Sequence, residues 1–278
     1  MAAPLLLGCD FSSSPSRQKT IVIATGRLVD AGVALSNLEY FTSLEAWAAR
    51  LAQPGERWVG GFDMPFGLPR ELVQALGWPT DWAACMDHYQ RLSRADIRST
   101  FKAFCAARPV GQKFAHRATD GPAGSSPSMK WVNPPVAFML HAGVPLLRQA
   151  GVYLPGLMPT PAQPPERVAL EAYPGLLARA VLGRRSYKSD DKLRQTPDRL
   201  DARRALLASL EAGQFKGLRL QLAAEQRALL VSDARGDSMD AVLCQLQAAW
   251  ALQQHQQGAP LYGLPPDMDP LEGWIVGA

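Results

Sequence analysis

Leu5-Leu6-Leu7-Gly8-Cys9-Asp10 is a short apolar run that ends in an acid. Its length and its apolar character predict a buried β-strand. An ionised carboxylate at the end of such a strand is costly to bury unless it is paired or binds a metal ion. Asp10 is therefore the first candidate functional residue. The structural alternative is an aspartate that caps the turn at 11–16, which is rich in serine and proline.

The segments that follow predict three more strands and one helix. The expected strands are Thr20–Thr25, Val33–Phe41 and Trp58–Phe62, and the expected helix covers Ser43–Leu51. A helical crossover joins parallel strands, so the strand over 58–62 should run parallel to the first and can lie beside it. Asp63 directly follows that strand. Asp10 and Asp63 would then lie at the same edge of the sheet.

Residues 70–165 predict a mainly helical insertion on this sheet, because helical spacing prevails at 70–107 and 135–150. The remainder of the insertion is irregular or rich in proline. A fifth strand is expected at Arg167–Ala172, and a short extended piece at Gly273–Val276. Further helices are expected from Pro174 onward and over Pro197–Ala212, Leu218–Leu230 and Asp237–Gln257. The whole chain, 1–278, is predicted to be a single α/β domain with a mixed five-stranded sheet flanked by helices.

Three more acids join the candidate site. Glu171 lies within the predicted fifth strand, where glutamate is disfavoured, although an edge strand could turn it to water. Asp237 and Asp240 are three residues apart at the start of the last long helix, so both carboxylates lie on one face of its first turn. Acids at a helix start are also ordinary caps. Together with Asp10 and Asp63, these residues are the expected catalytic acids and Mg²⁺ or Mn²⁺ ligands, because hard cations prefer oxygen donors.

Charge is distributed unevenly along the chain, whose net charge is +4. Residues 91–130 contain eight Lys or Arg and two acids, and residues 179–204 contain nine Lys or Arg and four acids. The rest of the chain is acidic, so the basic segments are consistent with a polyanion that binds beside a metal site. The alternative is a solvated surface with ordinary charge clustering. The candidate substrate-binding residues within these segments are His116, Arg117, Lys130 and Lys188.

Other classes of protein find little support in the sequence. No apolar run approaches the roughly 20 residues of a membrane span, so no membrane association and a cytoplasmic location are expected. The four cysteines show no zinc-ligand or Cys-x-x-Cys spacing and predict buried, reduced thiols. Phosphate-binding glycine loops and the zinc-protease and serine-hydrolase motifs are also missing from the sequence.

Several short motifs, in this order, resemble the bacterial and archaeal family known as domain-of-unknown-function family 429. They are Gly8–Ser12, Gly61–Pro69, Glu171–Pro174, Asp237–Ala241 and Glu272–Ile275, with His116–Asp120 and Met129–Pro135 inside the insertion. The resemblance implies a ribonuclease H-like fold and a predicted nuclease. It further implies that metal is bound by Asp10, by Asp63 or Glu171, and by an acid of the last helix.

The sequence thus predicts a metal-dependent nuclease that hydrolyses phosphodiester bonds of nucleic acid between two carboxylate-held cations. A non-catalytic nucleic-acid-binding or scaffold protein of the same fold is the alternative. An actin-like ATPase or sugar kinase would share the early strand hairpin and aspartate, but this chain lacks the second domain and the second glycine-rich phosphate loop of that class. Neither the substrate nor the oligomeric state follows from the sequence.

Overall fold

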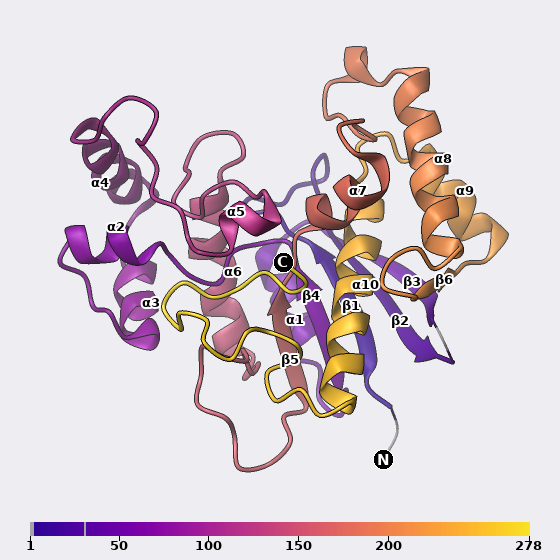
Figure 1. The fold of residues 1–278 in the computed structure, drawn as a ribbon, viewed down its shortest axis with the longest axis horizontal. Coiled ribbons are helices and arrows are strands. Elements are labelled where there is room, and N and C mark those ends of the chain that lie inside the picture. Colours follow the sequence, from indigo (N-terminus) through magenta and orange to yellow (C-terminus); the bar gives the residue numbers. More distant parts are fainter. Residues whose placement is uncertain (1–2, 31) are drawn as a thin grey trace.

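A computed structural model describes residues 3–30 and 32–278 of the chain. Its strands are β1 (Leu5–Asp10), β2 (Ile21–Val29), β3 (Gly32–Phe41), β4 (Trp58–Phe62), β5 (Arg167–Glu171) and β6 (Arg219–Gln221). They form one mixed sheet in the order β5-β4-β1-β2-β3-β6 (Figure 1). Only the β1–β2 and β2–β3 pairs are antiparallel. The chain is therefore a mixed α/β protein, and β4 lies parallel to β1 and beside it.

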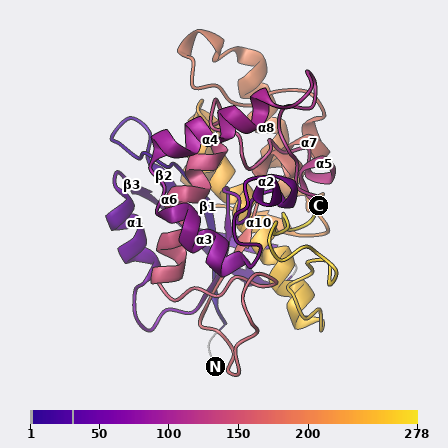
Figure 2. The ribbon, with the colours of Figure 1, turned by 90° about the vertical axis from the view of Figure 1, so that its left-hand side faces the viewer.

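Helices cover both faces of this sheet. Before β5 the chain forms α1 (Leu44–Leu51), α2 (Arg70–Ala75), α3 (Trp82–Gln90), α4 (Arg94–Ala106), α5 (Asp120–Ala123) and α6 (Val136–Gln149). After β5 it forms α7 (Pro174–Leu182), the 3₁₀ turn η1 (Lys192–Arg194), α8 (Pro197–Glu211), α9 (Ala224–Ser232) and α10 (Asp237–Gln256). Figure 2 shows α3, α4 and α6 in front of the sheet and α10 behind it.

Each face of the sheet has its own apolar core because side chains alternate along a strand. Leu7 and Cys9 of β1 pack with α1 and the helices at 70–150, whereas Leu6 packs with the helices that follow β5. The four cysteines are buried and unpaired. No helix of the described residues has both the length and the apolar character needed to cross a membrane.

The C-terminal part of the sheet differs from the sequence prediction in two places. The segment expected to be a helix at Leu218–Leu230 instead forms β6 and, after a two-residue link, most of α9, so the described sheet has six strands instead of five. β6 pairs only with the open edge of β3, a contact remote in sequence. The extended piece expected at Gly273–Val276 is not a strand. Val276 N–H donates to the Glu171 carbonyl oxygen at 2.9 Å, but Ile275 N–H donates to the Thr119 hydroxyl, at 3.0 Å, and no ladder forms.

Two glycines bring α10 directly onto the middle of the sheet. A Cβ added at Gly8 of β1 would lie 2.0 Å from the Ala241 carbonyl oxygen, and one at Gly61 of β4 would lie 2.3 Å from that of Cys244. Both contacts are to helix backbone, which cannot rotate away as a side chain can. The absence of a side chain at these positions therefore sets the distance between α10 and the strands.

We predict that Gly8→Ala lowers the free energy of unfolding by about 1–3 kcal/mol, because the new methyl group would clash with the rigid backbone of α10. Urea denaturation measures the change. Gly121→Ala is the matched control, since a Cβ at Gly121 meets nothing within 4 Å and its backbone is not left-handed. Equal stability of the two variants would contradict the proposed helix–sheet contact.

Candidate metal centre

Asp10 and Asp63 come together because they end neighbouring parallel strands in matching register. Cys9 of β1 lies opposite Phe62 of β4, and the Asp63 N–H donates to the Cys9 carbonyl oxygen at 2.9 Å. Each aspartate lies two residues beyond a glycine that contacts α10, so both carboxylates point to the α10 face. The sequence prediction that these two acids share one edge of the sheet is confirmed.

α10 delivers the third carboxylate. Asp240 lies in the first turn of this helix and is fully buried. One carboxylate oxygen from each of Asp10, Asp63 and Asp240 can be chosen so that all lie within 4.8 Å of one another. This is the spacing of ligands around one cation or a shared pair of cations. The group is built from two strand ends and a helix start that lie far apart in the sequence.

Negative charge exceeds positive charge in this group, and the pKa values of its acids are raised. Burial, followed by repulsion from Asp240, raises the pKa of Asp10 well above its ordinary value. The same two causes raise the pKa of Asp63 to about 7. Desolvation and like charges both disfavour ionised carboxylates, and a bound cation would reverse both effects.

Two basic side chains partly compensate the acids. The Lys188 ammonium forms an ion pair with one oxygen of Asp240, while the Tyr187 hydroxyl donates to the other. Burial alone would lower the pKa of Lys188, but Asp240, Tyr187 and Asp10 together outweigh burial and raise that pKa well above its ordinary value. Asp237 lies at the margin of the group, where Lys19 pairs with it at 3.4 Å.

Glu171 does not join the group because it faces the other side of the sheet. It lies opposite Phe62 in the β4–β5 register, and Phe62 packs in the core that faces the insertion. Its partner there is Arg117, whose two terminal nitrogens bind the Glu171 oxygens at 2.6 and 2.8 Å. Asp120 and the Glu272 carbonyl oxygen accept the remaining N–H groups of Arg117.

Arg117 therefore has a structural partner for each of its five N–H donors. Burial alone would lower its pKa, but Glu171 and Asp120 raise it, so the guanidinium stays charged. The sequence predicts Arg117 as a substrate-binding residue, but in the structure all its N–H groups bind acceptors within the protein. Its side chain contributes to a pocket wall without a free donor for a phosphate.

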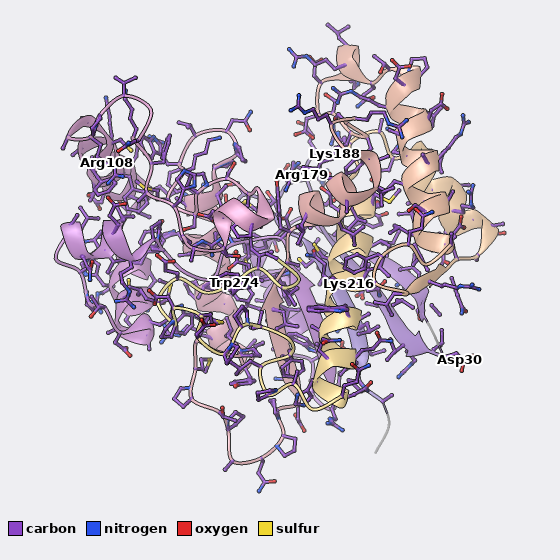
Figure 3. The ribbon with its side chains drawn as sticks, in the orientation of Figure 1. Asp30, Arg108, Arg179, Lys188, Lys216 and Trp274 are labelled. Atoms are coloured by element: carbon purple, nitrogen blue, oxygen red, sulfur yellow. The ribbon has the colours of Figure 1, made fainter. Side chains whose placement is uncertain are left out.

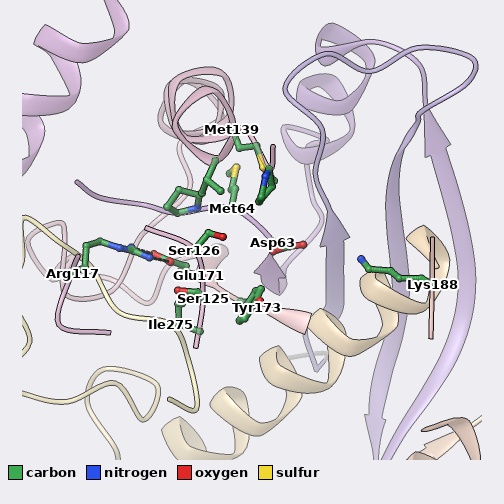
Figure 4. Close-up of a pocket in the computed structure, with 14 residues that line it drawn as sticks. Asp63, Met64, Arg117, Ser125, Ser126, Met139, Glu171, Tyr173, Lys188 and Ile275 are labelled. Carbon is green, nitrogen blue, oxygen red and sulfur yellow. Dashed lines mark hydrogen bonds and ion pairs between the residues drawn. The ribbon is translucent and has the colours of Figure 1, made fainter. Parts of the chain in front are cut away.

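A cavity of about 230 Å³ adjoins the cluster of Asp10, Asp63 and Asp240, the candidate metal group, and shares Asp63 with it (Figure 4). Figure 4 shows Lys188 on one side of Asp63, with Glu171 and Arg117 on the other. The remaining walls come from the segment after β4, the 125–139 region and the ends of β5 and of the chain. They are Met64, Pro65, Ser125, Ser126, Pro134, Val136, Met139, Ala172, Tyr173 and Ile275.

The other predicted substrate-binding residues lie apart from this cavity. His116 is exposed and Lys130 is half-buried, and neither lines the cavity. Three further residues were not predicted from the sequence: Tyr187 and Lys19, which contact Asp240 and Asp237, and Asp120, which binds Arg117. Tyr187 directly precedes the predicted Lys188, but only the fold brings its hydroxyl to Asp240.

Comparison with known proteins gives one match. The family model described as "Protein of unknown function (DUF429)" matches residues 8–265. The matched region includes the three clustered aspartates, Lys188 and the residues between them. No curated protein and no solved structure matches the chain.

We predict that the metal-free protein loses stability as the pH rises toward neutrality. The folded-state pKa of Asp63, about 7, lies above the ordinary 3.8, so its contribution is fully present below about pH 4 and lost as the pH passes 7. At about 1.4 kcal/mol per pKa unit, the loss is at most about 4 kcal/mol. Thermal unfolding in a chelator between about pH 4 and 8 measures most of this loss.

Asp63→Asn removes one titrating group and should make this pH dependence shallower, with the part due to Asp10 remaining. The control Asp201→Asn changes an exposed acid on α8 and should retain the wild-type profile. A wild-type slope in Asp63→Asn would show that Asp63 is not the group that titrates.

Proposed function

We propose that this chain, which belongs to the family described as "Protein of unknown function (DUF429)", is a divalent-metal-dependent hydrolase of phosphodiester bonds in nucleic acid. The observation that carries the proposal is the convergence of Asp10, Asp63 and Asp240 beside a cavity that shares Asp63. Clustered carboxylates next to a cavity are what metal-assisted phosphoryl transfer needs, because cations neutralise both the acids and the phosphate.

The donor set fits Mg²⁺ or Mn²⁺. All three ligand candidates offer carboxylate oxygen, which hard cations prefer over nitrogen or sulfur. If Asp10, Asp63, Asp237 and Asp240 are all ionised, their four negative charges face the two ammonium groups of Lys19 and Lys188. The remaining charge of −2 would be neutralised by one divalent cation. Asp237 is the acid nearest at hand for a second ion.

The proposal includes a ribonuclease H-like fold. The β1–β2–β3 meander continues into parallel β4 and β5, and α10 crosses the strands with its acidic first turn at their C-terminal ends. This arrangement places the acids where parallel sheets present functional groups. The helical segment 70–165 would then be an insertion that supplies the outer wall of the cavity.

The side chains have separable tasks in the proposed hydrolysis. Asp10, Asp63 and Asp240 would hold the cation, which when bound supplies Lewis acidity and lowers the pKa of water. Lys188 lies at both Asp240 and the cavity, so its ammonium can orient a phosphate oxygen. In the reaction, water gives up a proton, its oxygen bonds to phosphorus, the ester P–O bond breaks, and the leaving oxygen gains a proton.

Basic side chains on both sides of the site support a nucleic acid as the substrate. Arg94 at the start of α4 donates to Ser14 in the turn after Asp10, at 2.8 Å. Arg184 and Arg185, just before Lys188, are exposed. Figure 3 shows Arg179 and Lys188 above the C-terminal edge of the strands. A phosphate backbone that reached the acids would pass between positive groups.

We predict that Asp10→Asn abolishes Mn²⁺-dependent cleavage and weakens Mn²⁺ binding at least tenfold, without loss of metal-free stability. Removing one of several repelling buried carboxylates relieves repulsion, so metal-free stability should stay equal or rise. Calorimetric titration with Mn²⁺ and thermal unfolding with and without Mn²⁺ provide the readouts. Asp201→Asn is the control, which should bind and cleave as the wild type does.

Two results would decide against this function. If Asp10→Asn lowers metal-free stability by roughly 0.5–2 kcal/mol and gains as much from Mn²⁺ as the wild type, Asp10 is a turn cap. If the wild type binds Mn²⁺ and nucleic acid but never turns over, the non-catalytic binding protein of the same fold is the better description.

We also predict that affinity for single-stranded nucleic acid falls steeply as salt rises. Each phosphate contact contributes a slope of about 0.7 to the plot of log affinity against log salt. Arg185→Glu should weaken binding and flatten that slope, whereas Arg27→Glu, an exposed arginine of β2, should not. Binding insensitive to salt between about 50 and 200 mM, measured by fluorescence anisotropy, would exclude a polyanion partner.

A further inference from the structure

The cavity beside the metal group is small and walled by several chain segments. Its volume of about 230 Å³ lies below the roughly 300–1,000 Å³ of drug-sized ligand pockets. Such a space has room for one flat ring system with a small substituent, and it does not admit a stacked base pair. The size of the cavity therefore limits what can stand next to Asp63.

The chemistry of the walls is that of a site for a flat, partly polar ring. Met64, Met139 and Ile275 supply apolar and polarisable surface, and Tyr173 supplies an aromatic ring. The hydroxyls of Ser125 and Ser126 are the polar groups of the insertion wall, and Ser125 is held by Asp120 at 3.1 Å. A nucleobase combines stacking faces with polar edges in this way.

Fixed contacts keep the walls in place. Arg117 joins Asp120 of the insertion wall to Glu171 of β5 across the floor of the cavity. Arg179 of α7 donates to the Ala123 carbonyl oxygen and lies over the Tyr173 ring, with its guanidinium carbon 5.3 Å from the ring centre. The aromatic wall and the serine wall are therefore tied to each other, and a ligand would meet a preformed space.

We infer that this cavity binds a single unpaired nucleotide, with the base between Met139 and Tyr173 and the phosphate toward Asp63 and Lys188. The inference rests on the proposed function for the position of the phosphate. A base within a duplex reaches such a pocket only by leaving the stack, so the protein would select nucleotides that are already unpaired. Strand ends and internal single-stranded positions share this chemistry.

Binding of AMP tests the pocket without any cleavage. AMP should bind at least tenfold more tightly than ribose 5-phosphate, because only AMP carries the base. Met139→Trp and Ser126→Trp fill the cavity from two different elements and should reduce AMP affinity to that of ribose 5-phosphate. Gln149→Trp, ten residues and about 15 Å further along α6, is the control and should leave AMP affinity unchanged.

Isothermal titration with and without Mn²⁺ distinguishes the two proposals. Equal affinity for AMP and ribose 5-phosphate, or wild-type AMP affinity in both folded tryptophan variants, would overturn the nucleotide pocket. If base discrimination is present but the wild type does not bind Mn²⁺, the metal proposal fails and the pocket stands. Unchanged Mn²⁺ affinity in Met139→Trp would confirm that filling the cavity spares the metal group.

Linear, circular and duplex substrates distinguish a nucleotide at a strand end from one at an internal single-stranded position. A linear single-stranded oligonucleotide, the same oligonucleotide circularised and a blunt duplex are compared with Mn²⁺ present. Cleavage of the linear form alone assigns the pocket to strand ends, and cleavage of both single-stranded forms assigns it to internal unpaired nucleotides. Cleavage of the duplex as fast as the single strand would overturn the selection of unpaired nucleotides.

Discussion

The close contact of α10 with β1 and β4 is the constraint on which the rest of the structure depends. Gly8 and Gly61 leave no side chain between the strands and the helix backbone. The first turn of α10 consequently reaches the strand ends, where Asp240 meets Asp10 and Asp63. A bulkier strand would push the helix outward and separate the carboxylates. Packing of the core and assembly of the acidic group therefore depend on the same close contact, which the two glycines permit.

The alternation of side chains along the strands then divides the acids between two tasks. Asp10 and Asp63 face α10 and form the candidate metal group, whereas Glu171 faces the insertion and binds Arg117. The Arg117 network buries several charges, and its desolvation cost is offset because every donor of the guanidinium has an acceptor. Its effect is positional, because it joins the insertion to the end of β5 and shapes the cavity beside Asp63.

The Arg117 network and the aspartate cluster around Asp240 differ in how their charges are paired. Around Arg117 a single guanidinium contacts both neighbouring carboxylates, and each of its N–H donors has an acceptor. Around Asp240 four acids face two ammonium groups, and the pKa values of Asp10 and Asp63 are raised. A protein that only needed stability would gain little from such repulsion. The imbalance is what connects the fold to the proposed metal-dependent chemistry, and the adjoining cavity connects that chemistry to a nucleotide-sized ligand.

The sequence by itself determined the strands β1 to β5, the helical character of 70–107 and 135–150, and the shared edge of Asp10 and Asp63. These follow from local apolar patterns and from the rule that helical crossovers join parallel strands. It could not determine β6, because three residues form a strand only where β3 offers an open edge. Nor could it separate Glu171 from the aspartates or find Tyr187 beside Asp240. Which face a strand residue occupies, and which distant side chain meets it, depend on register and helix packing, and these exist only in the tertiary structure.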